Sequence, residues 1–321
     1  MDLESLSLLS VYSATVVYAL AFLLFALDIA SFGSARKDEA QTAQAQKREL
    51  VAAGAAAASQ GSARDAQPAV AKAKKAPRRN WLRAGFALTV LGWLLHLVGT
   101  VLRGVAAERV PWSNMYEFAL TGALLATGVF VFIQFWRDLR FLGVYITGMA
   151  TIFLGTAALN YYVPISPLPP ALQSPWLVIH VFVATLAVGF LAISSGLSIL
   201  QLLRNRFGRN GFLASLPKAD ILEGLAYRLA VLGFLFWTFT LMAGAVWAHQ
   251  AWGRYWGWDT KEVWTFIIWV VYAGYLHARS TRGWRGTASA VLNLIGFGTI
   301  IFNYAIVNVY FEGLHAYSGL E

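Results

Sequence analysis

Long apolar segments alternate with short polar connections along most of this chain. Each apolar segment approaches the ~20 residues that an α-helix needs to cross the hydrocarbon core of a bilayer. The pattern therefore predicts an all-α fold, a polytopic transmembrane helical bundle with about eight spans. The predicted spans cover residues 6–30, 81–101, 116–136, 139–161, 176–203, 227–248, 262–278 and 287–309.

One segment breaks this alternation. Residues 34–80 are rich in Ala, Gln, Lys and Arg, and most of their apolar content is alanine. Such a composition does not form a core, so we expect either disorder or a loosely packed helix there. The chain then divides into a first transmembrane helix at 1–33, a low-complexity basic cytoplasmic linker at 34–80 and a membrane domain at 81–321. The basic run at 72–79 either contacts anionic membrane lipid or only sets the orientation, and we favour the second interpretation.

Composition and charge refine this topology. Hydrophobic residues make up 58% of the chain and charged residues only 13%, which excludes a soluble domain of this size. Lys and Arg gather in alternate connections, at 34–80, 137–140, 204–228 and 279–285. Because basic loops of membrane proteins face the cytoplasm, both termini are predicted to lie on the outer face. The net charge of +9 therefore reflects orientation, and no nucleic-acid partner is expected.

Tryptophan concentrates in one connection and the helices beside it. Six of the 13 Trp residues lie within 247–269, around the string W-G-R-Y-W-G-W-D-T-K-E-V-W at 252–264. Glycines allow close approach of the backbone, and cations and carboxylates are interleaved with the rings. A flat aromatic ligand with anionic edges, such as heme, suits this surface. The alternatives are an aromatic belt at the membrane–water interface and, for Asp259 and Glu262, a helix-capping box.

This string resembles the tryptophan-rich WWD signature of heme-handling proteins in cytochrome c maturation. The surrounding sequence is similar to the CcsA/ResC family, the membrane components of system-II cytochrome c synthases. The resemblance runs from about residue 81 to the C-terminus and omits residues 33–80. Its supporting pieces are P-W-S-N-M-Y-E at 111–117, W-L-V-I-H at 176–180, G-A-V-W-A at 244–248, Y-L-H-A-R at 275–279 and G-L-H-A-Y at 313–317.

The resemblance implies cytochrome c biogenesis in the bacterial plasma membrane, with heme b as the cofactor. Heme would be transported to the outer face, held at the tryptophan-rich segment and attached to an apocytochrome c that presents Cys-x-x-Cys-His. The chain contains no cysteine, so the reacting thiols belong to the client and are kept reduced by other proteins. A CcsB/ResB-type membrane protein is the implied partner, and together the two would form a cytochrome c heme lyase (synthase).

The predicted topology assigns the five histidines to different positions relative to the membrane. His180 and His315 belong to the outer face, and the resemblance implies that they are the axial ligands of the heme iron there. His277 resembles the family's transmembrane heme ligand, near which heme would enter from the cytoplasmic side. Its partner would come from the CcsB/ResB protein, with His96 as a weaker candidate. His249 adjoins the signature, but the family pattern places no ligand there; without the resemblance, a histidine at a helix end is more often an ordinary polar interface residue.

Further binding roles follow from residue chemistry and from the resemblance. The expected heme platform consists of Trp252, Trp256 and Trp258. The expected anchors for the heme propionates are Arg254 and Lys261. No catalytic residue is certain: Asp259 and Glu262 either hydrogen-bond the ligands or the client, or only cap the following helix.

Two other functions remain open at the level of sequence. A heme exporter or chaperone would bind and present heme without attaching it, because other maturation proteins also carry a tryptophan-rich signature. An unrelated secondary transporter would carry the tryptophans only as an aromatic belt. Binding of heme distinguishes the transporter from the other two, and a requirement for the CcsB/ResB-type partner distinguishes the synthase.

Overall fold

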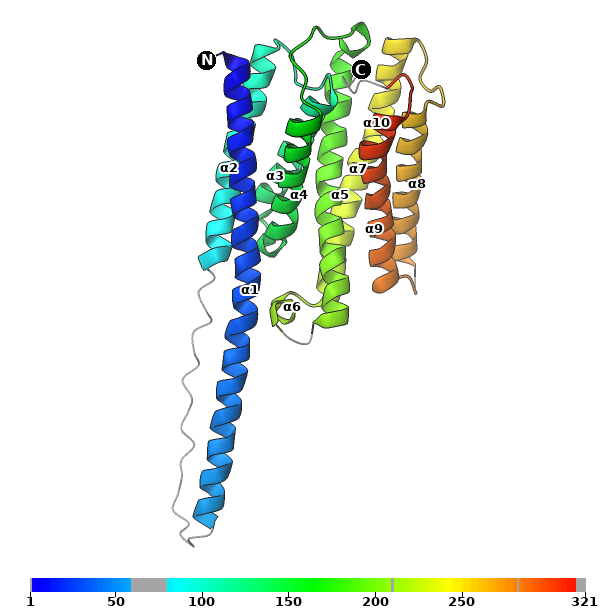
Figure 1. The fold of residues 1–321 in the computed structure, drawn as a ribbon. Coiled ribbons are helices and arrows are strands. Elements are labelled where there is room, and N and C mark those ends of the chain that lie inside the picture. Colours follow the sequence, from blue (N-terminus) through cyan, green and yellow to red (C-terminus); the bar gives the residue numbers. More distant parts are fainter. Residues whose placement is uncertain (1, 59–79, 209–210, 282, 316–321) are drawn as a thin grey trace.

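The computed structural model describes residues 2–58, 80–208, 211–281 and 283–315, and every regular element within these ranges is helical (Figure 1). The long helices are α1 (Leu3–Ala58), α2 (Asn80–Ala106), α3 (Met115–Ile133), α4 (Gly143–Asn160), α5 (Pro175–Phe207), α7 (Ala219–Trp252), α8 (Thr260–Ser280) and α9 (Thr287–Phe302). Short helical segments are η1 (Arg140–Leu142), η2 (Pro170–Leu172), α6 (Gly211–Ser215), the π-helical η3 (Asn303–Val307) and α10 (Asn308–Tyr310). The predicted all-α fold is confirmed.

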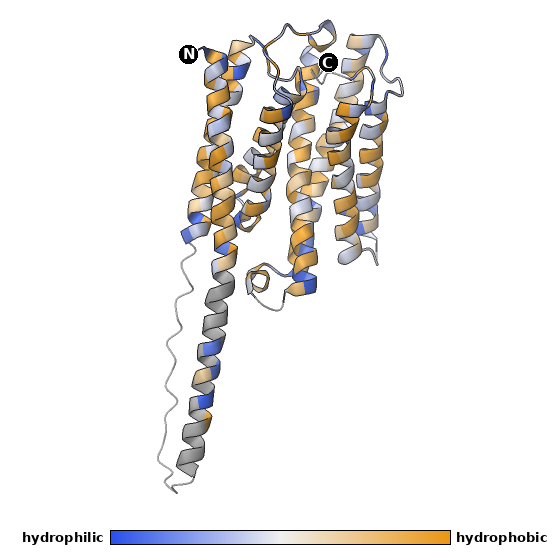
Figure 2. Ribbon diagram, viewed as in Figure 1, coloured by the Kyte–Doolittle hydropathy of each residue, from blue (hydrophilic) through white to orange (hydrophobic). Residues whose placement is uncertain are grey.

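Helix α5 lies at the centre of the bundle. It packs against α3 on one side and against α7 and α9 on the other, while α8 closes one edge by packing on α7 and α9. At the opposite edge α1 pairs with α2 and also packs on α4. Apolar residues cover the outside of the bundle as well as its interior (Figure 2), as lipid in place of water requires.

Among the described residues, seven helices are long and apolar enough to cross a membrane, against the eight spans predicted. The remaining long helix, α8, runs alongside α9 and has 21 residues, enough for ~30 Å of helix. Its apolarity is lower because it carries Lys261, Glu262, His277 and Arg279. The chain is therefore a multi-pass membrane protein, and the helix that follows its tryptophan-rich loop carries more charge than a typical span.

Helix α1 continues beyond its predicted end. The apolar part, Leu3–Ser31, has the composition of a membrane span, but the helix extends to Ala58 and projects well past the bundle (Figure 1). Residues 34–58, placed in the predicted linker, thus form the second half of one long helix. The basic run at 72–79 lies outside the described residues, and the division into three parts stays a prediction.

The beginning of α1 and the end of α10 lie at the same end of the bundle as the loop 253–259 between α7 and α8 (Figure 1). We call this the tryptophan end. The loops 107–114 and 161–174 lie there too, so the extramembrane segments that carry the candidate chemistry share one face of the protein. Which side of the membrane this end occupies stays a prediction.

A buried ionic cluster stabilises the tryptophan end. Arg103 is 1% exposed and Glu117 is fully buried, and Arg103 Nε donates to Glu117 Oε1 at 3.0 Å. Arg103 Nη1 also donates to Glu4 at 2.9 Å, and Arg109 Nη1 donates to Glu117 Oε2 at 2.7 Å. The cluster therefore joins the first turn of α1, the last turn of α2 and the first turn of α3.

The P-W-S-N-M-Y-E string, to which the sequence assigned no role, supplies part of this cluster. Asn114 is the N-cap of α3, because its side chain accepts from Glu117 N at 2.9 Å. The backbone N–H and the hydroxyl of Ser113 both donate to Glu117 Oε2. Because buried charges are stable only when they are paired and hydrogen-bonded, the string acts by placing Glu117 between two arginines.

Candidate functional site

The tryptophan-rich loop is a short connection between two capped helices. Helix α7 ends at Trp252, where Gly253 adopts a left-handed conformation with φ of 71°. Helix α8 begins at Thr260, and Glu262 Oε2 accepts from the backbone N–H groups of Gly257 (2.8 Å) and Asp259 (3.0 Å). Of the two roles open for Glu262, the structure shows the capping role, which holds the loop in a compact turn.

His180 lies in the second turn of α5 and faces α7. Its Nδ1 is 3.0 Å from the carbonyl oxygen of Thr240, the geometry of an Nδ1–H donating to that oxygen. The ring stacks on Trp247, with 5.8 Å between centroids and 16° between planes. The absence of a side chain at Gly244 permits this packing, since a Cβ there would lie 2.7 Å from the imidazole. The Nδ1 bond leaves the Nε2 lone pair available to a ligand.

His315 follows α10 and returns to the same place. Its Nδ1 lies 2.6 Å from Asp259 Oδ2, and Asp259 Oδ1 accepts from the backbone N–H of Leu314 at 3.2 Å. The hydrogen bond from His315 holds the pKa of the Asp259 carboxyl below its usual range, so this group is a carboxylate at neutral pH. Because the carboxylate accepts from Nδ1–H, Nε2 is again left free, and the carboxylate raises the basicity of Nε2 as a ligand.

The two predicted ligands both contact one indole ring. Trp247 stacks on His180 and makes an edge contact with His315, with 5.4 Å between the latter two centroids. Both histidines line the same cavity. We call it the histidine cavity. Its other lining residues are Thr240, Leu241, Gly244, Ala245, Ala248, Tyr255, Trp256, Lys261, Glu262 and Thr265.

The three predicted platform tryptophans occupy different positions. Trp256 lines the histidine cavity, and Trp252 packs on His315 with 4.8 Å between centroids. Trp258 contacts Trp256 but is 73% exposed and adopts a φ of 61°, which a bulky residue rarely does. Trp247, which the sequence placed only in a family-like string, makes more contacts with the histidines than any of the three.

The two predicted cations also differ. Arg254 folds over its own loop, with Nη1 3.4 Å from the carbonyl oxygen of Gly257. Lys261 points into the bundle, where its ammonium donates to the carbonyl oxygen of Asn303 (3.3 Å) and to the side-chain oxygen of Asn308. Lys261 lines the histidine cavity together with His180 and His315.

The remaining histidines lie elsewhere. His277 is exposed on α8, on a side of the helix other than that of the buried Tyr272 and Tyr275. His96 is fully buried against α1, with its Nδ1 3.5 Å from the hydroxyl of Tyr18. His249 is exposed and stacks on Tyr255, 4.4 Å between centroids. Neither His96 nor His249 contacts His277, so the described residues do not complete a second histidine pair within this chain.

The donor set suits a metal that brings its own equatorial ligands. Among the described residues, no group of three or more His, Cys, Asp and Glu side chains gathers to hold a bare metal ion. Two imidazoles with Nε2 free, beside aromatic rings and one cation, are instead what a metalloporphyrin requires, because the macrocycle supplies four nitrogens and the protein only the axial ligands. The residues of the histidine cavity therefore fit heme.

These observations define a class: a polytopic helical membrane protein with a paired-histidine site under a tryptophan-rich loop. The profile of the family described as cytochrome C assembly protein matches residues 112–315, and the chain belongs to that family. It is 34% identical over 253 residues to the cytochrome c biogenesis protein CcsA of Trieres chinensis, covering 68% of this chain and 81% of the relative. It is 35% identical over 258 residues to CcsA of Prochlorococcus marinus, covering 70% and 80%.

A solved structure shares the fold. The cytochrome c heme lyase CcmF superposes with a TM-score of 0.64 at 16% sequence identity, and the match covers 95% of this chain and 47% of CcmF. The present chain thus spans about half of that larger protein. The suspected membership in the CcsA family is confirmed, and the chain is a membrane protein of cytochrome c biogenesis.

Proposed function

We propose that this protein receives heme b, holds it in the histidine cavity with His180 and His315 as axial ligands, and presents it for covalent attachment to apocytochrome c. The observation that carries the proposal is that the Nδ1 atoms of both rings have hydrogen-bond partners. Each has its Nδ1 engaged, one by Thr240 and one by Asp259, so that both Nε2 atoms remain for iron. The chain's membership in the cytochrome c assembly family supports the same function.

In this proposal the residues of the chain hold the heme and orient it toward the client. Trp247 packs on both imidazoles, Trp256 offers a ring to the wall of the cavity, and Lys261 offers a cation for a propionate. Arg254 is proposed as a second propionate anchor. Heme supplies the iron and the two vinyl groups, and each client thiol adds across one vinyl, with sulfur bonding one carbon and hydrogen the other. Positioning the two reactants contributes to the rate by removing the entropy cost of their encounter.

The proposal includes a partner. His277 is exposed on α8, where a second membrane protein of the CcsB/ResB type would supply the other ligand of a transmembrane heme site. Lipid surrounds both proteins, and separate proteins keep the client thiols reduced. The tryptophan end is proposed to face outward from the bacterial plasma membrane, where the apocytochrome arrives.

The test is the visible spectrum of the purified protein, oxidised and reduced. We expect a six-coordinate b-type heme spectrum that the double variant His180→Ala/His315→Ala loses, because both axial nitrogens are gone. His249→Ala is the matched control, since it removes an exposed imidazole near the same loop and should leave the spectrum unchanged. An unaltered spectrum in the double variant would overturn the assignment.

A second measurement separates attachment from delivery. Co-expression with a CcsB/ResB-type partner and an apocytochrome should yield covalently bound heme in a denaturing gel stained for heme peroxidase activity. If heme binds normally but no covalent product forms with the partner present, the chain is a heme exporter or chaperone instead. Family membership already argues against an unrelated secondary transporter.

A further inference from the structure

A group of buried polar side chains lies in the half of the bundle away from the tryptophan end. Helix α5 contributes Ser194, Ser198 and Gln201, and α9 contributes Asn293, all at most 1% exposed. Asn293 Nδ2 donates to the hydroxyl oxygens of Ser194 and Ser198, at 2.8 Å each. Gln201 Nε2 donates to the carbonyl oxygen of Gly286, the N-cap of α9, at 2.9 Å. These contacts join α5 to α9, and we call the group the polar network.

An ion pair connects the polar network to the surface of the protein. Glu223 of α7 accepts through Oε2 from the backbone N–H of Gly286, at 3.0 Å, and from Gln201 Nε2, at 3.4 Å. Its Oε1 lies 2.5 Å from Nε of Arg279 on α8. The side chain of Arg279 is 16% exposed, so the polar groups of four helices form a connection from the end of the bundle into its interior.

Three atoms at the inner part of this connection have no hydrogen-bond partner among the described residues. They are Asn293 Oδ1, Gln201 Oε1 and the hydroxyl oxygen of Tyr272 on α8. Tyr272 is fully buried, and its ring lies so close to Gly296 of α9 that an added Cβ there would be 3.0 Å away. Because Gly296 follows Asn293 by three residues, the phenol and the amide lie beside neighbouring positions of the same helix face.

These unpaired atoms need a further partner. A buried polar group without a hydrogen bond costs free energy, and the hydrocarbon around a membrane protein offers it none. Exchanging the oxygen and nitrogen of the Asn293 amide does not remove this cost, because Ser194 and Ser198 contact only one end of the amide in either orientation. Side chains that served only to join helices would be paired with one another at both ends. The free ends therefore indicate a bound molecule.

Water is the molecule that fits these atoms. Asn293 Oδ1 and Gln201 Oε1 only accept hydrogen bonds, whereas the Tyr272 hydroxyl donates or accepts. A water molecule can donate two bonds and accept others, and buried waters usually make about three. A metal cation would lose its hydration in exchange for neutral oxygens, because Glu223 is already paired with Arg279.

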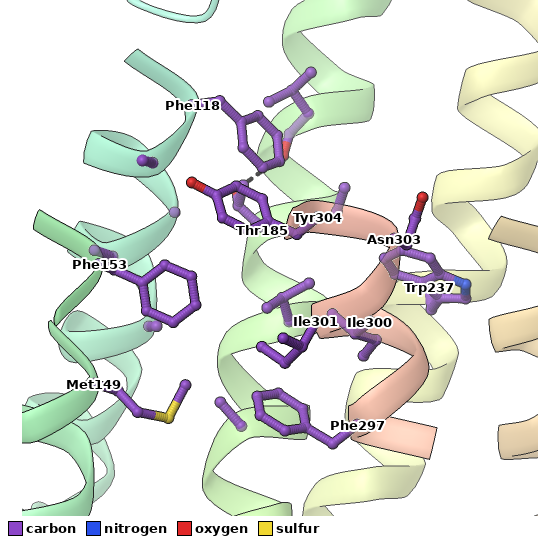
Figure 3. A pocket seen from close by; sticks show the side chains of 18 of the residues that line it. Phe118, Met149, Phe153, Thr185, Trp237, Phe297, Ile300, Ile301, Asn303 and Tyr304 are labelled. Atoms are coloured by element: carbon purple, nitrogen blue, oxygen red, sulfur yellow. Dashed lines mark hydrogen bonds between the residues drawn. The ribbon is translucent and has the colours of Figure 1, made fainter. Parts of the chain in front are cut away.

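A large cavity of the bundle does not serve these atoms. Trp237, Phe297 and Ile300 line that cavity (Figure 3), and they belong to the same hydrophobic core as Tyr272. Asn293, Gln201 and Tyr272 are absent from its lining and from that of the histidine cavity. The partner of the unpaired atoms is therefore local to the polar network.

We propose that ordered water molecules occupy the polar network, bridge its unpaired atoms to the Tyr272 hydroxyl, and connect them with the Glu223–Arg279 pair at the surface. This hydration site goes beyond the proposed function, since its residues do not line the histidine cavity and its occupant is not heme. It gives the hydroxyl proton of a fully buried tyrosine a path of exchange with solvent at the end of the bundle away from the tryptophan-rich loop.

The test is hydroxyl-radical labelling of the full-length protein in detergent, started by an X-ray pulse and read by mass spectrometry of its peptides. Radicals that form from a bound water oxidise the side chain beside it, even where bulk solvent has no access. Phe130 is the internal control, because it is fully buried in an apolar cluster. We expect Tyr272 to be oxidised at least ~10-fold faster than Phe130 after correction for the reactivity of the free amino acids, since buried water contacts only polar groups. Equal corrected rates would overturn the proposal.

Two leucine variants locate the water. Asn293→Leu removes the amide while nearly keeping its volume, so the water loses an anchor and oxidation of Tyr272 should fall toward the rate of Phe130. Asn205→Leu makes the same change at an exposed position near the end of α5 and should leave the labelling unchanged. Low oxidation of Phe130 in both variants reports that the bundle is intact. Fast oxidation of Tyr272 that survives in an intact Asn293→Leu protein would overturn the proposed bridge.

The salt of the buffer distinguishes water from a cation. Labelling is repeated in equal concentrations of sodium, potassium and choline chloride. Bound water gives the same Tyr272 rate in all three, whereas a rate that changes with the small cation would overturn the proposal in favour of a cation site. Protein purified with and without heme should also give equal rates, so the result does not depend on the proposed function.

Discussion

At the scale of single residues, the candidate site depends on what occupies each Nδ1. Thr240 offers His180 a neutral carbonyl, whereas Asp259 offers His315 a carboxylate. A carboxylate makes an imidazole a more basic and more firmly oriented ligand than a carbonyl does. The two axial positions of the proposed heme are therefore unequal, and His180 is the ligand that a client histidine would displace more easily.

Asp259→Asn tests this inequality. The amide keeps the shape of the side chain but removes the charge, so His315 should bind iron less tightly. We expect the affinity for heme to fall about 10–100-fold, the usual effect of losing such a partner, measured by titration of the apoprotein with hemin. Glu312→Gln, which neutralises an exposed carboxylate on the same segment, should leave the affinity unchanged. Equal affinities of Asp259→Asn and wild type would contradict the role given to Asp259.

The tryptophans provide a second prediction at this scale. Trp256 lines the histidine cavity and Trp258 is mostly exposed, although both belong to the same short loop. Trp256→Ala should therefore lower the heme occupancy of the purified protein, measured as the ratio of heme absorbance to protein, and Trp258→Ala should lower it less. The opposite order would show that the exposed ring is the platform. Each variant serves as the control for the other.

At the scale of elements, the ionic cluster and the caps determine how the loops sit on the helices. Glu117 joins α3 to Arg103 of α2 and to Arg109 of the connecting loop, and Arg103 extends the contact to Glu4 of α1. These pairs are buried, so their geometry rather than their number decides their effect on stability. The cluster fixes the first turn of α3, which begins at Met115.

Glu117→Gln should destabilise the bundle. The neutral side chain leaves the two arginines without their shared counter-charge, a change that costs about 3–5 kcal/mol when one partner of a buried pair is lost. We expect a clearly lower midpoint of thermal unfolding in detergent, followed by intrinsic fluorescence. Glu108→Gln makes the same chemical change at an exposed position in the loop after α2, and its midpoint should match that of wild type. Equal midpoints for both variants would mean that the cluster adds no net stability.

At the scale of the whole molecule, the candidate chemistry gathers at one end of the bundle. The loops at the tryptophan end contain Asp259 and His315, whereas the opposite end has a separate ion pair between Arg279 and Glu223. The extended half of α1 projects beyond that opposite end (Figure 1). This polarity is what a protein that hands a ligand to one side of a membrane requires.

The orientation of this polarity can be measured directly. Because the chain has no cysteine, single cysteines report only their own position. Leu159→Cys at the tryptophan end should react with a membrane-impermeant maleimide in intact cells, since that end is proposed to face outward. Phe135→Cys, exposed at the other end of the bundle, should react only after permeabilisation. The reverse pattern would place the histidine cavity on the cytoplasmic side.

The sequence by itself determined the class of fold and much of the chemistry. Apolar segments near the length of a membrane span predict helices regardless of context, because lipid leaves the backbone no other partner than itself. The tryptophan-rich string and the resemblance it carries named the candidate residues, and their roles stay predictions. For residues 34–58 the sequence left disorder and a loosely packed helix open, and these residues continue α1 as a helix.

Tertiary structure decided the rest. Thr240 and Asp259 are far from His180 and His315 in sequence, so no local pattern shows that they hold the two rings. Lys261 donates to a carbonyl in the π-helical η3, 42 residues further along the chain. Hydrogen bonds and cavities arise between elements that fold together from distant parts of the chain, and a one-dimensional pattern does not contain those distances.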